Sequence, residues 1–284
     1  MRFFPFVCVL VLFVSCQKDA SPGGGGNSLA ATTSLNLSYG SDPLQKMDMY
    51  LPAGRSSTRT PSIIMIHGGA WMTGDKSDFN AYVDTLKKRL PDYAIFNLNY
   101  RLAAGTSNLF PTQENDIKAA YNFITARLND YAVSDKLVLL GASAGGHLAL
   151  LQGYKNSGPL APKAIIDFFG PTDLANLHDH PGDPAIATVL ELLLAGTPAT
   201  QASLYQQSSP IQFVTSQSAP TLILQGGVDP LVPAAQSAAL DAALQAKGVT
   251  RQYVFYPTEG HGWLGANLRD SFDKIQQFLT ANVH

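Results

Sequence analysis

The sequence predicts an α/β domain with a mostly parallel central sheet and helices on both faces. Short apolar runs of strand length alternate with longer amphipathic segments through most of the chain. Of the 284 residues, 45% are hydrophobic, which is enough to bury a sizeable core. One strand also passes into a helix within a few residues, at Gly141 and Ser143. In folds of this class, ligands bind at the carboxyl ends of the strands.

The first predicted elements form an antiparallel hairpin at the edge of the sheet. Leu35–Tyr39 and Lys46–Leu51 alternate apolar and polar side chains, as half-buried strands do. Gly40–Pro43 between them has the composition of a turn. The next strand, Ser62–Ile66, is a short run with β-branched residues, of the kind that is buried on both faces.

Strands and helices then alternate to the C-terminus. Further strands are expected at Ala94–Asn99, Lys136–Leu140, Ala164–Phe169, Thr221–Gln225 and Gln252–Tyr256. Helices are expected at Phe79–Leu90, Glu114–Leu128, Ala234–Ala246 and Asn267–Asn282. Residues 172–218 break this rhythm, because one apolar helical piece, Ala185–Leu194, is set among Pro, Gly, Gln and Ser. We expect this segment to be a small cap insertion over the carboxyl edge of the sheet.

The first sixteen residues have the pattern of an export signal. One Arg at position 2 precedes the apolar stretch Phe3–Val14, which is too short to span a bilayer comfortably. Phe13 to Cys16 resembles a bacterial lipobox, with Phe in place of the usual Leu. We therefore expect Cys16 to be lipidated and the protein to be an exported, membrane-anchored lipoprotein at the periplasmic face or cell surface. The alternative is ordinary secretory cleavage with Cys16 merely nearby.

A flexible tether, residues 17–34, is expected between this signal and the catalytic domain, residues 35–284. It contains four consecutive glycines from Gly23 to Gly26. Both cysteines, Cys8 and Cys16, precede the domain, which therefore has no thiol for a disulfide, a metal cluster or a nucleophile. We expect neither a metal nor an organic cofactor.

The charge of the chain excludes two classes of partner. Only 14% of the residues are charged, the net charge is −2, and no run of Lys and Arg occurs. There is thus no electrostatic basis for binding nucleic acid or anionic lipid. We expect no nucleic-acid partner.

The strand that ends near Gly141 predicts a nucleophile elbow. Gly141, Ser143 and Gly145 form the pattern G-x-S-x-G, in which the glycines leave room for a sharp turn around the serine. The serine then lies at the N-terminus of a helix, where backbone N–H groups favour developing negative charge.

A serine nucleophile needs a base, and His261 is the best candidate. It follows the strand Gln252–Tyr256 in a loop where Gly260 and Gly262 flank it. The remaining histidines before the C-terminal His284 are expected to have structural or surface roles: His67, His147, His178 and His180. His178 and His180 suggest a metal pair, but no third ligand is identifiable, which favours a solvated loop.

The base in turn needs an acid, for which Asp229 is the first choice. It follows the strand Thr221–Gln225 and gives the chain order Ser, Asp, His, with each residue after a different strand. Asp173, which also follows a strand, and Glu259, which shares the histidine's loop, are the rivals.

Backbone donors for an oxyanion are expected after the strand Ser62–Ile66. The glycine-rich string from His67 to Trp71 can direct N–H groups of Gly69 and Ala70 toward the site, together with that of Ala144 after the nucleophile.

Three aromatic residues are candidates for substrate contact. Trp71, Tyr205 and Trp263 are expected to form an aromatic floor for sugar or phenolic rings. Plain core packing is the alternative for each of them.

Six stretches together resemble the α/β-hydrolase superfamily, in particular its bacterial carboxylesterase branch with His-Gly-Gly-x-Trp and Gly-x-Ser-Ala-Gly-Gly-His motifs. They are Met47–Pro52, His67–Trp71, Asn99–Leu102, Gly141–Ala149, Gly226–Pro233 and Gly260–Trp263. The resemblance implies a serine esterase with Ser143, Asp229 and His261 as its triad, which agrees with the assignment from the residues themselves. The oxyanion string departs from the all-glycine version at Ala70.

Relatives of this pattern include acetylxylan and feruloyl esterases, so the resemblance implies a small-molecule or polysaccharide ester as substrate. Ala70 and Trp71 narrow the oxyanion side, which favours a short acyl group such as acetyl. The alternatives are an arylformamidase-like amidase, which shares the His67–Trp71 motif, and a non-catalytic binding protein on a hydrolase fold. Export counts against the first, and the presence of all three triad candidates counts against the second.

Overall fold

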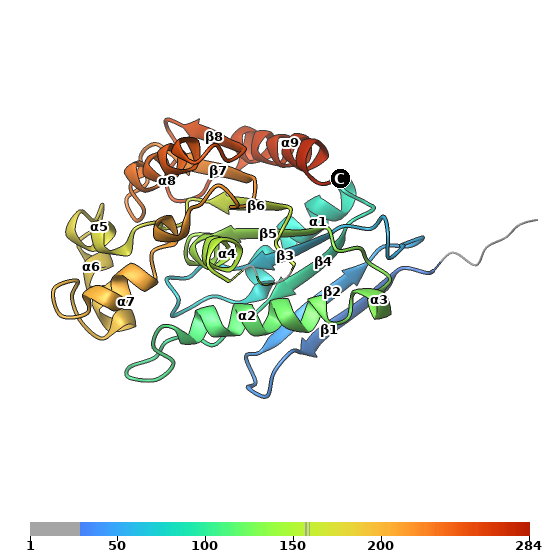
Figure 1. Ribbon diagram of the computed structural model, residues 1–284, viewed down its shortest axis with the longest axis horizontal. Helices are drawn as coiled ribbons and strands as arrows, with labels where there is room; N and C mark the ends of the chain where they lie inside the picture. The colour runs from blue at the N-terminus through green and yellow to red at the C-terminus, as the bar shows by residue number, and fades with distance from the viewer. Residues whose placement is uncertain (1–28, 157, 159) are drawn as a thin grey trace, which may run out of the picture.

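The computed structural model describes residues 29–156, 158 and 160–284 and contains one eight-stranded sheet (Figure 1). The strand order is β1-β2-β4-β3-β5-β6-β7-β8. Strands β3 to β8 run parallel, and β1 and β2 are antiparallel to their neighbours. This confirms the expected fold class. The export signal, Cys16 and the tether as far as residue 28 lie outside the described residues.

The strands coincide closely with the predicted ones. Their bounds are β1 Thr32–Ser38, β2 Lys46–Leu51, β3 Ser62–Ile66, β4 Ala94–Leu98, β5 Leu137–Ala142, β6 Ala164–Phe168, β7 Thr221–Gly226 and β8 Arg251–Tyr256. The antiparallel edge hairpin is confirmed, but β1 begins at Thr32, inside the expected tether. Thr32 pairs with Leu51 at the end of β2, so the length of β2 sets where β1 begins. Most of β1 is solvent-exposed, which weakens its apolar alternation as a signal.

Helices cover both faces of the sheet and form two apolar layers. They are η1 Lys76–Phe79, α1 Asn80–Arg89, α2 Thr112–Thr125, α3 Leu128–Tyr131, α4 Ala144–Tyr154, α5 Leu174–Asp179, α6 Ala185–Leu194, α7 Ala202–Gln207, η2 Pro210–Phe213, α8 Ala234–Ala246 and α9 Gly265–Asn282. Side chains of α2, α4 and α8 pack with Ile64 and Ile66 of β3 on one face. Those of α1 and α9 pack with Ile63 and Met65 on the other. The alternation along β3 shows that this strand is buried on both faces, as predicted. Within the described ranges, no helix has the length and hydropathy of a membrane-crossing segment.

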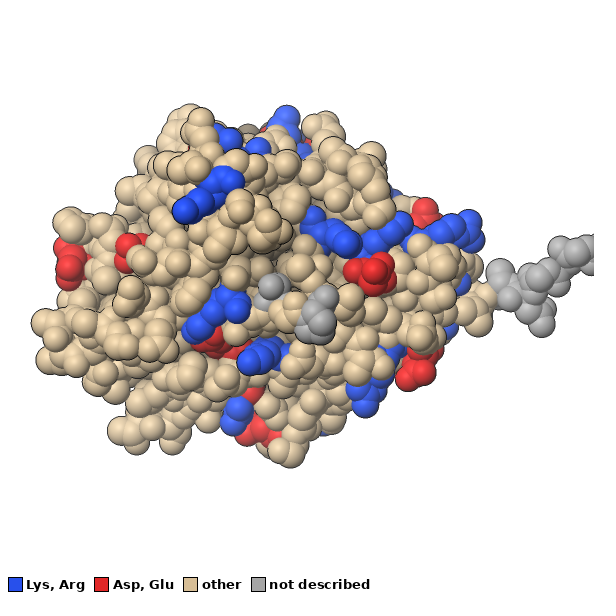
Figure 2. Space-filling model, viewed as in Figure 1, with Lys and Arg blue, Asp and Glu red and all other residues tan. Residues whose placement is uncertain are grey.

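Residues 172–218 fold into α5, α6, α7 and η2, which gather beyond the end of β6 (Figure 1). The expected helix Ala185–Leu194 is confirmed with the same bounds. The short helices α5 and α7, of six residues each, were not expected, because so few residues carry no clear helical period. The segment contains no Lys or Arg. In Figure 2 the visible surface over these helices accordingly shows acidic residues among mainly uncharged ones.

Candidate active site

Ser143 lies at a sharp turn between the central strand β5 and helix α4. Its backbone has φ 55° and ψ −125°, a sparsely populated positive-φ conformation that costs a non-glycine residue about 1–3 kcal/mol. The amide of Ser143 donates to the carbonyl of Phe168 at 2.8 Å, which fixes the turn to β6. Gly145 is needed because a Cβ there would lie 2.0 Å from the carbonyl oxygen of Ile66. The elbow geometry thus follows from the glycine spacing.

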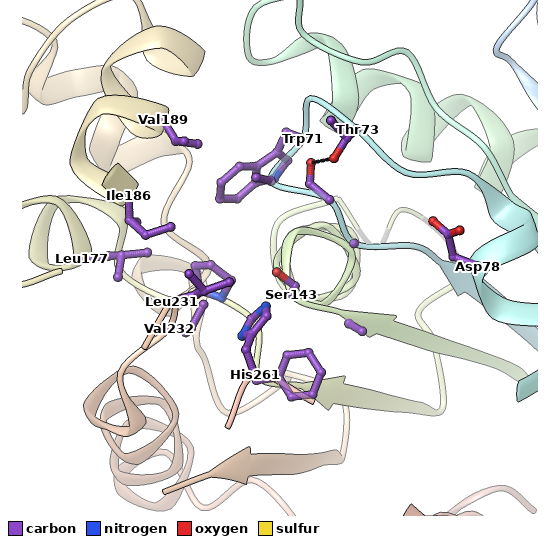
Figure 3. A pocket seen from close by; sticks show the side chains of 16 residues that line it. Trp71, Thr73, Asp78, Ser143, Leu177, Ile186, Val189, Leu231, Val232 and His261 are labelled. Carbon is purple, nitrogen blue, oxygen red and sulfur yellow. Dashed lines mark hydrogen bonds between the residues drawn. The ribbon is translucent and has the colours of Figure 1, made fainter. Parts of the chain in front are cut away.

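His261 and Asp229 form a close pair at the ends of neighbouring strands. Nδ1 of His261 lies 2.7 Å from Oδ2 of Asp229, while the other oxygen, Oδ1, accepts from the amides of Leu231 and Val232 at 2.9 Å each. The Asp229 carboxylate is therefore held in place by two backbone amides in addition to its contact with the imidazole. Because Nδ1 faces Asp229, Nε2 lies on the opposite side of the ring. Figure 3 shows the imidazole directed toward the hydroxyl of Ser143.

The rival carboxylates are engaged elsewhere. Asp173 caps helix α5 by accepting from the amide of Asn176 at 3.0 Å. Glu259 accepts from the side-chain amide of Asn267 at 2.6 Å. The structure brings Asp229 to His261, as the first choice from sequence required.

Residues 67–74, called the oxyanion turn after the role expected of its amides, connect β3 to η1 and lie against the elbow. Gly69, Ala70 and Trp71 all have positive φ, at 109°, 50° and 61°. Among the described residues, the amides of Gly69 and Ala70 have no hydrogen-bond partner. Both residues line the same cavity as Ser143. A Cβ at Gly68 would lie 2.9 Å from the carbonyl oxygen of Ala142, so only glycine allows the turn to approach the elbow this closely.

The stretch after β4 supports the oxyanion turn from behind. The Asn99 side chain accepts from the amide of Lys76 at 2.5 Å and donates to Asp75 at 2.6 Å. The Tyr100 hydroxyl donates to the carbonyl of His67 at 3.0 Å, and the two rings stack with centroids 4.4 Å apart. These residues belong to a stretch that carries the family resemblance, but sequence reasoning gave them no role.

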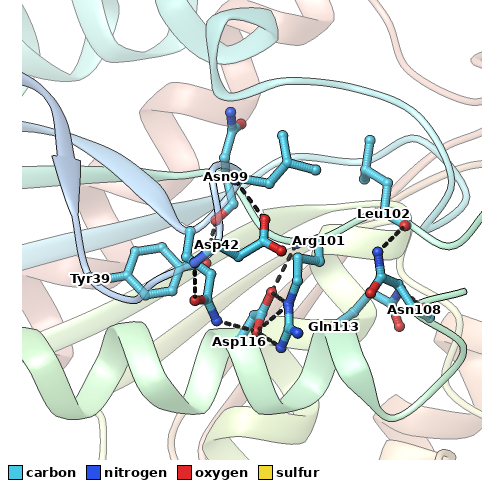
Figure 4. Close-up of polar contacts among 10 residues, drawn as sticks. Tyr39, Asp42, Asn99, Arg101, Leu102, Asn108, Gln113 and Asp116 are labelled. Atoms are coloured by element: carbon cyan, nitrogen blue, oxygen red, sulfur yellow. Dashed lines mark hydrogen bonds and ion pairs between the residues drawn. The ribbon is translucent and has the colours of Figure 1, made fainter.

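Arg101 extends this support to helix α2 and the edge hairpin (Figure 4). Its guanidinium binds the Asp116 carboxylate through Nε and Nη2, and Asp116 also accepts from Gln45 at 2.7 Å. The Tyr39 hydroxyl donates to the carbonyl of Asn99 at 2.6 Å. The loop 99–101 is thereby held at both ends, which gives the oxyanion turn a rigid base.

The cavity at Ser143 has a volume of about 410 Å³ and is mainly apolar (Figure 3). Ser143, His261, Thr73 and Asp78 supply its polar side chains. Apolar side chains from six segments complete the lining: Ala70, Trp71, Ala142, Phe169, Pro171, Leu177, Ile186, Val189, Leu231 and Val232. Leu177 of α5 and Ile186 and Val189 of α6 bring the 172–218 segment into the site.

The expected aromatic floor needs correction. Trp71 lines the cavity, but Tyr205 and Trp263 do not. Tyr205 is buried and donates its hydroxyl to the carbonyl of Gly196 at 3.1 Å. Trp263 is buried in the core, where its indole donates to Ser271 at 2.8 Å. Both residues therefore have packing roles in the interior. The aromatic residue that sequence reasoning missed is Phe169, whose ring centroid lies 4.6 Å from that of His261.

The remaining histidines do not meet Ser143 in the cavity. His178 lies between Asp179 and Glu191 on the 172–218 segment, at 2.8 and 3.0 Å. His180 is exposed and contacts Asn176. His67 is buried under Tyr100, and burial lowers its pKa. His147 is buried in α4.

A buried carboxyl behind the elbow was also missed. Asp167 of β6 accepts from the amide of Gly170 at 3.0 Å through Oδ1, and burial raises its pKa to about 7. A Cβ at Gly146 would lie 2.3 Å from this oxygen, so the carboxyl packs directly on the first turn of α4. Sequence reasoning missed Asp167 because an aspartate within a predicted strand can equally face solvent, and nothing in the sequence distinguishes the two cases.

Known proteins resemble the chain in sequence and in structure. A family model described as BD-FAE matches residues 47–244. Esterase LipQ of Mycobacterium tuberculosis is 28% identical over 236 residues, which cover 78% of this chain and 55% of that protein. The solved structure of a bifunctional GH43-CE of Bacteroides eggerthii has a TM-score of 0.77 at 24% identity, covering 89% of this chain and 35% of that one. A truncated form of a carbohydrate esterase from gut microbiota also has a TM-score of 0.77 at 24% identity, covering 90% of this chain and 97% of that one.

The chain spans about half the length of the curated relatives it matches. At 24% identity the structural matches define the fold, and the sheet order, elbow and covering helices are those of the α/β-hydrolase fold. The family model covers well over half of the chain. The chain therefore belongs to the BD-FAE family.

Proposed function

We propose that this protein is a serine carboxylic-ester hydrolase with Ser143 as nucleophile, His261 as general base and Asp229 as the acid that orients it. The observation that carries the proposal is the Asp229–His261 pair, 2.7 Å apart, which faces the serine of a strained elbow inside a mainly apolar cavity. Serine is a weak nucleophile until a base takes its proton, and this arrangement supplies one.

The proposed reaction has two steps. Oγ of Ser143 attacks the ester carbonyl carbon while Nε2 of His261 takes the hydroxyl proton. The amides of Gly69, Ala70 and Ala144 stabilise the resulting oxyanion, because two of them have no partner among the described residues and the third begins helix α4. The C–O bond to the alcohol then breaks, and His261 gives its proton to the departing oxygen. Water activated by the same base hydrolyses the acyl-enzyme.

The proposed substrates are short-chain acyl esters, with acetyl or feruloyl esters of plant polysaccharide as the natural class. Two structural neighbours bear the titles of a GH43-CE protein and a carbohydrate esterase. Trp71 of the oxyanion turn and the α6 residues Ile186 and Val189 limit the room near Ser143 in the cavity of about 410 Å³. This lining favours a small acyl group.

The test compares wild type with Ser143→Ala on p-nitrophenyl esters, acetylated xylan, feruloylated arabinoxylan and N-formylkynurenine. Loss of a triad serine costs on the order of a millionfold in kcat, so the variant is expected to be inactive with an unchanged thermal midpoint. A preference for N-formylkynurenine would establish the arylformamidase-like alternative. A wild-type protein that binds these compounds and turns none of them over would establish the binding-protein alternative.

We further propose export and lipid anchoring through Cys16, which rests on the pattern of residues 1–16. Cys16→Ser is expected to abolish incorporation of labelled palmitate and to leave the specific activity of the folded domain unchanged. A wild-type protein that incorporates no label would instead be an ordinary secreted enzyme.

A further inference from the structure

One side-chain hydrogen bond joins the oxyanion turn directly to the helix that carries the nucleophile. The indole Nε1 of Trp71 donates to Nδ1 of His147 at 3.1 Å, and the two rings meet edge to face with centroids 5.1 Å apart. His147 lies one turn after Ser143 in α4, where its amide donates to the Ser143 carbonyl at 3.0 Å. Trp71 is 3% exposed and His147 is fully buried.

The other nitrogen of His147 determines which tautomer is present. Nε2 lies 2.7 Å from the carbonyl oxygen of Ser208, an acceptor, so Nε2 carries the proton. Nδ1 is then free of a proton and accepts from Trp71. Burial lowers the pKa of His147 to about 4, with Lys155 acting in the same direction, so the ring is neutral when the enzyme works near neutral pH.

The backbone of Trp71 needs such an anchor. Its φ of 61° lies in the left-handed region, which strains a bulky residue, and Ala70 before it has φ 50°. The Trp71 carbonyl accepts from the amide of Ala103 at 2.9 Å, which holds the turn from outside. The bond to His147 holds it from inside, against α4.

We propose that His147 is a positioning residue that sets the oxyanion donors of the turn, Gly69 and Ala70, in register with the donor at Ala144. The inference rests on the proposed ester hydrolysis, because an oxyanion hole assembled from two segments works only if those segments are fixed relative to each other. Trp71 is the side chain through which His147 acts. Ser208 extends the same link to the 172–218 segment, so turn, nucleophile helix and covering segment share one buried histidine.

Two substitutions of His147 separate its two bonds. In His147→Asn, Oδ1 occupies the place of Nδ1 and still accepts from Trp71, while the donor to Ser208 is lost. In His147→Gln, the terminal amide reaches Ser208 and the acceptor for Trp71 is lost. We expect His147→Asn to keep kcat for p-nitrophenyl acetate within about threefold and His147→Gln to lower it about tenfold or more, below the loss from deleting one oxyanion donor outright.

Trp71→Phe removes the donor and leaves His147 in place, so it tests the same link if a His147 variant fails to fold. We expect kcat to fall about tenfold with KM changed less than twofold, and affinity for a trifluoromethyl ketone, which forms an oxyanion on the serine, to fall in parallel. The double variant Trp71→Phe/His147→Gln is expected to be no worse than the more affected single variant. Trp263→Phe is the matched control, because it removes a buried indole bond outside the cavity; it is expected to lower the thermal midpoint alone.

Three results would overturn the inference. They are an unchanged kcat in folded Trp71→Phe, equal losses in His147→Asn and His147→Gln, and a change confined to KM. A wild-type protein without ester hydrolysis would contradict the proposed function instead, so the two failures are distinguishable.

Discussion

The two walls of the cavity are built in different ways. The wall that carries Ser143, the oxyanion turn and the Asp229–His261 pair consists of strand ends held by short hydrogen bonds, close glycine contacts and left-handed backbone. The opposite wall, from α5 and α6, contributes aliphatic side chains such as Leu177, Ile186 and Val189. Directional bonds fix atoms for one reaction, whereas apolar packing fixes only shape and volume. Changes on the first wall should therefore alter kcat, and changes on the second should alter substrate choice.

The largest effect is expected at the Asp229–His261 pair. Asp229→Asn keeps the shape of the side chain but lets its amide donate to His261, which favours the wrong tautomer and should lower kcat about 10⁴-fold. The measurement is kcat with p-nitrophenyl acetate. Asp173→Asn is the matched control and should change kcat less than twofold, since Asp173 caps α5. If Asp173→Asn were the more damaging change, the assignment of the acid would be wrong.

A smaller loss is expected behind the oxyanion turn. Tyr100→Phe removes the hydroxyl that donates to His67 at 3.0 Å, so the turn should loosen and kcat fall about tenfold. Tyr121→Phe is the control, because that hydroxyl also donates to a backbone carbonyl, that of Leu160 at 2.7 Å, which is not part of residues 67–74. Both variants should lose about 1–2 kcal/mol in the free energy of unfolding by urea titration. Equal kcat in both would show that the turn does not depend on Tyr100.

A substitution on the wall formed by α5 and α6 should change the preference for the length of the acyl chain. Val189→Trp fills the cavity between α6 and Ser143, so hydrolysis of p-nitrophenyl butyrate should fall about tenfold, while that of the acetate should change less than twofold. Leu192→Trp on the same helix is the control, since Leu192 is 54% exposed and does not line the cavity. Equal losses for both esters would mean that α6 does not contact the acyl chain.

The last prediction concerns the pH dependence of stability, with no change expected in activity. Burial raises the pKa of Asp167 to about 7. Between about pH 4 and pH 7 the folded protein therefore keeps a proton on Asp167 that the unfolded chain has already lost. Stability should therefore fall as pH rises from about 4 to 7, and Asp167→Asn, which needs no proton, should remove this contribution. Urea titrations of both proteins across this range test the sign. A wild-type stability that rises more steeply with pH than that of the variant would contradict it.

The wall that carries Ser143 and the Asp229–His261 pair was far more predictable from sequence than the wall formed by α5 and α6. Gly141, Ser143 and Gly145 predict the elbow because only glycine permits the close contacts there, and that constraint is local. His261 and Asp229 were assigned from their places after strands and from chain order, and the structure brings them together. Tyr205 and Trp263 were misplaced because an aromatic residue near a strand end packs in a core as readily as it lines a site.

Other contributions are invisible along the chain. The bonds from Trp71 to His147 and from Tyr100 to His67 join residues 76 and 33 positions apart, and no spacing rule predicts such a pairing. Phe169 and Val189 line the cavity because of the course that the backbone takes after β6, and that course cannot be read from local sequence. Local constraint therefore predicts which residues meet at the site, and tertiary packing determines the support and the shape of the site.

Trapping the acyl-enzyme tests the central claim most directly. Wild-type protein is mixed with p-nitrophenyl acetate, quenched in acid within the first turnover, digested and analysed by mass spectrometry. The account predicts a burst of p-nitrophenol and one acetyl group on the peptide that contains Ser143, with neither in Ser143→Ala. Acetylation of a different residue, or turnover that persists in Ser143→Ala, would contradict it.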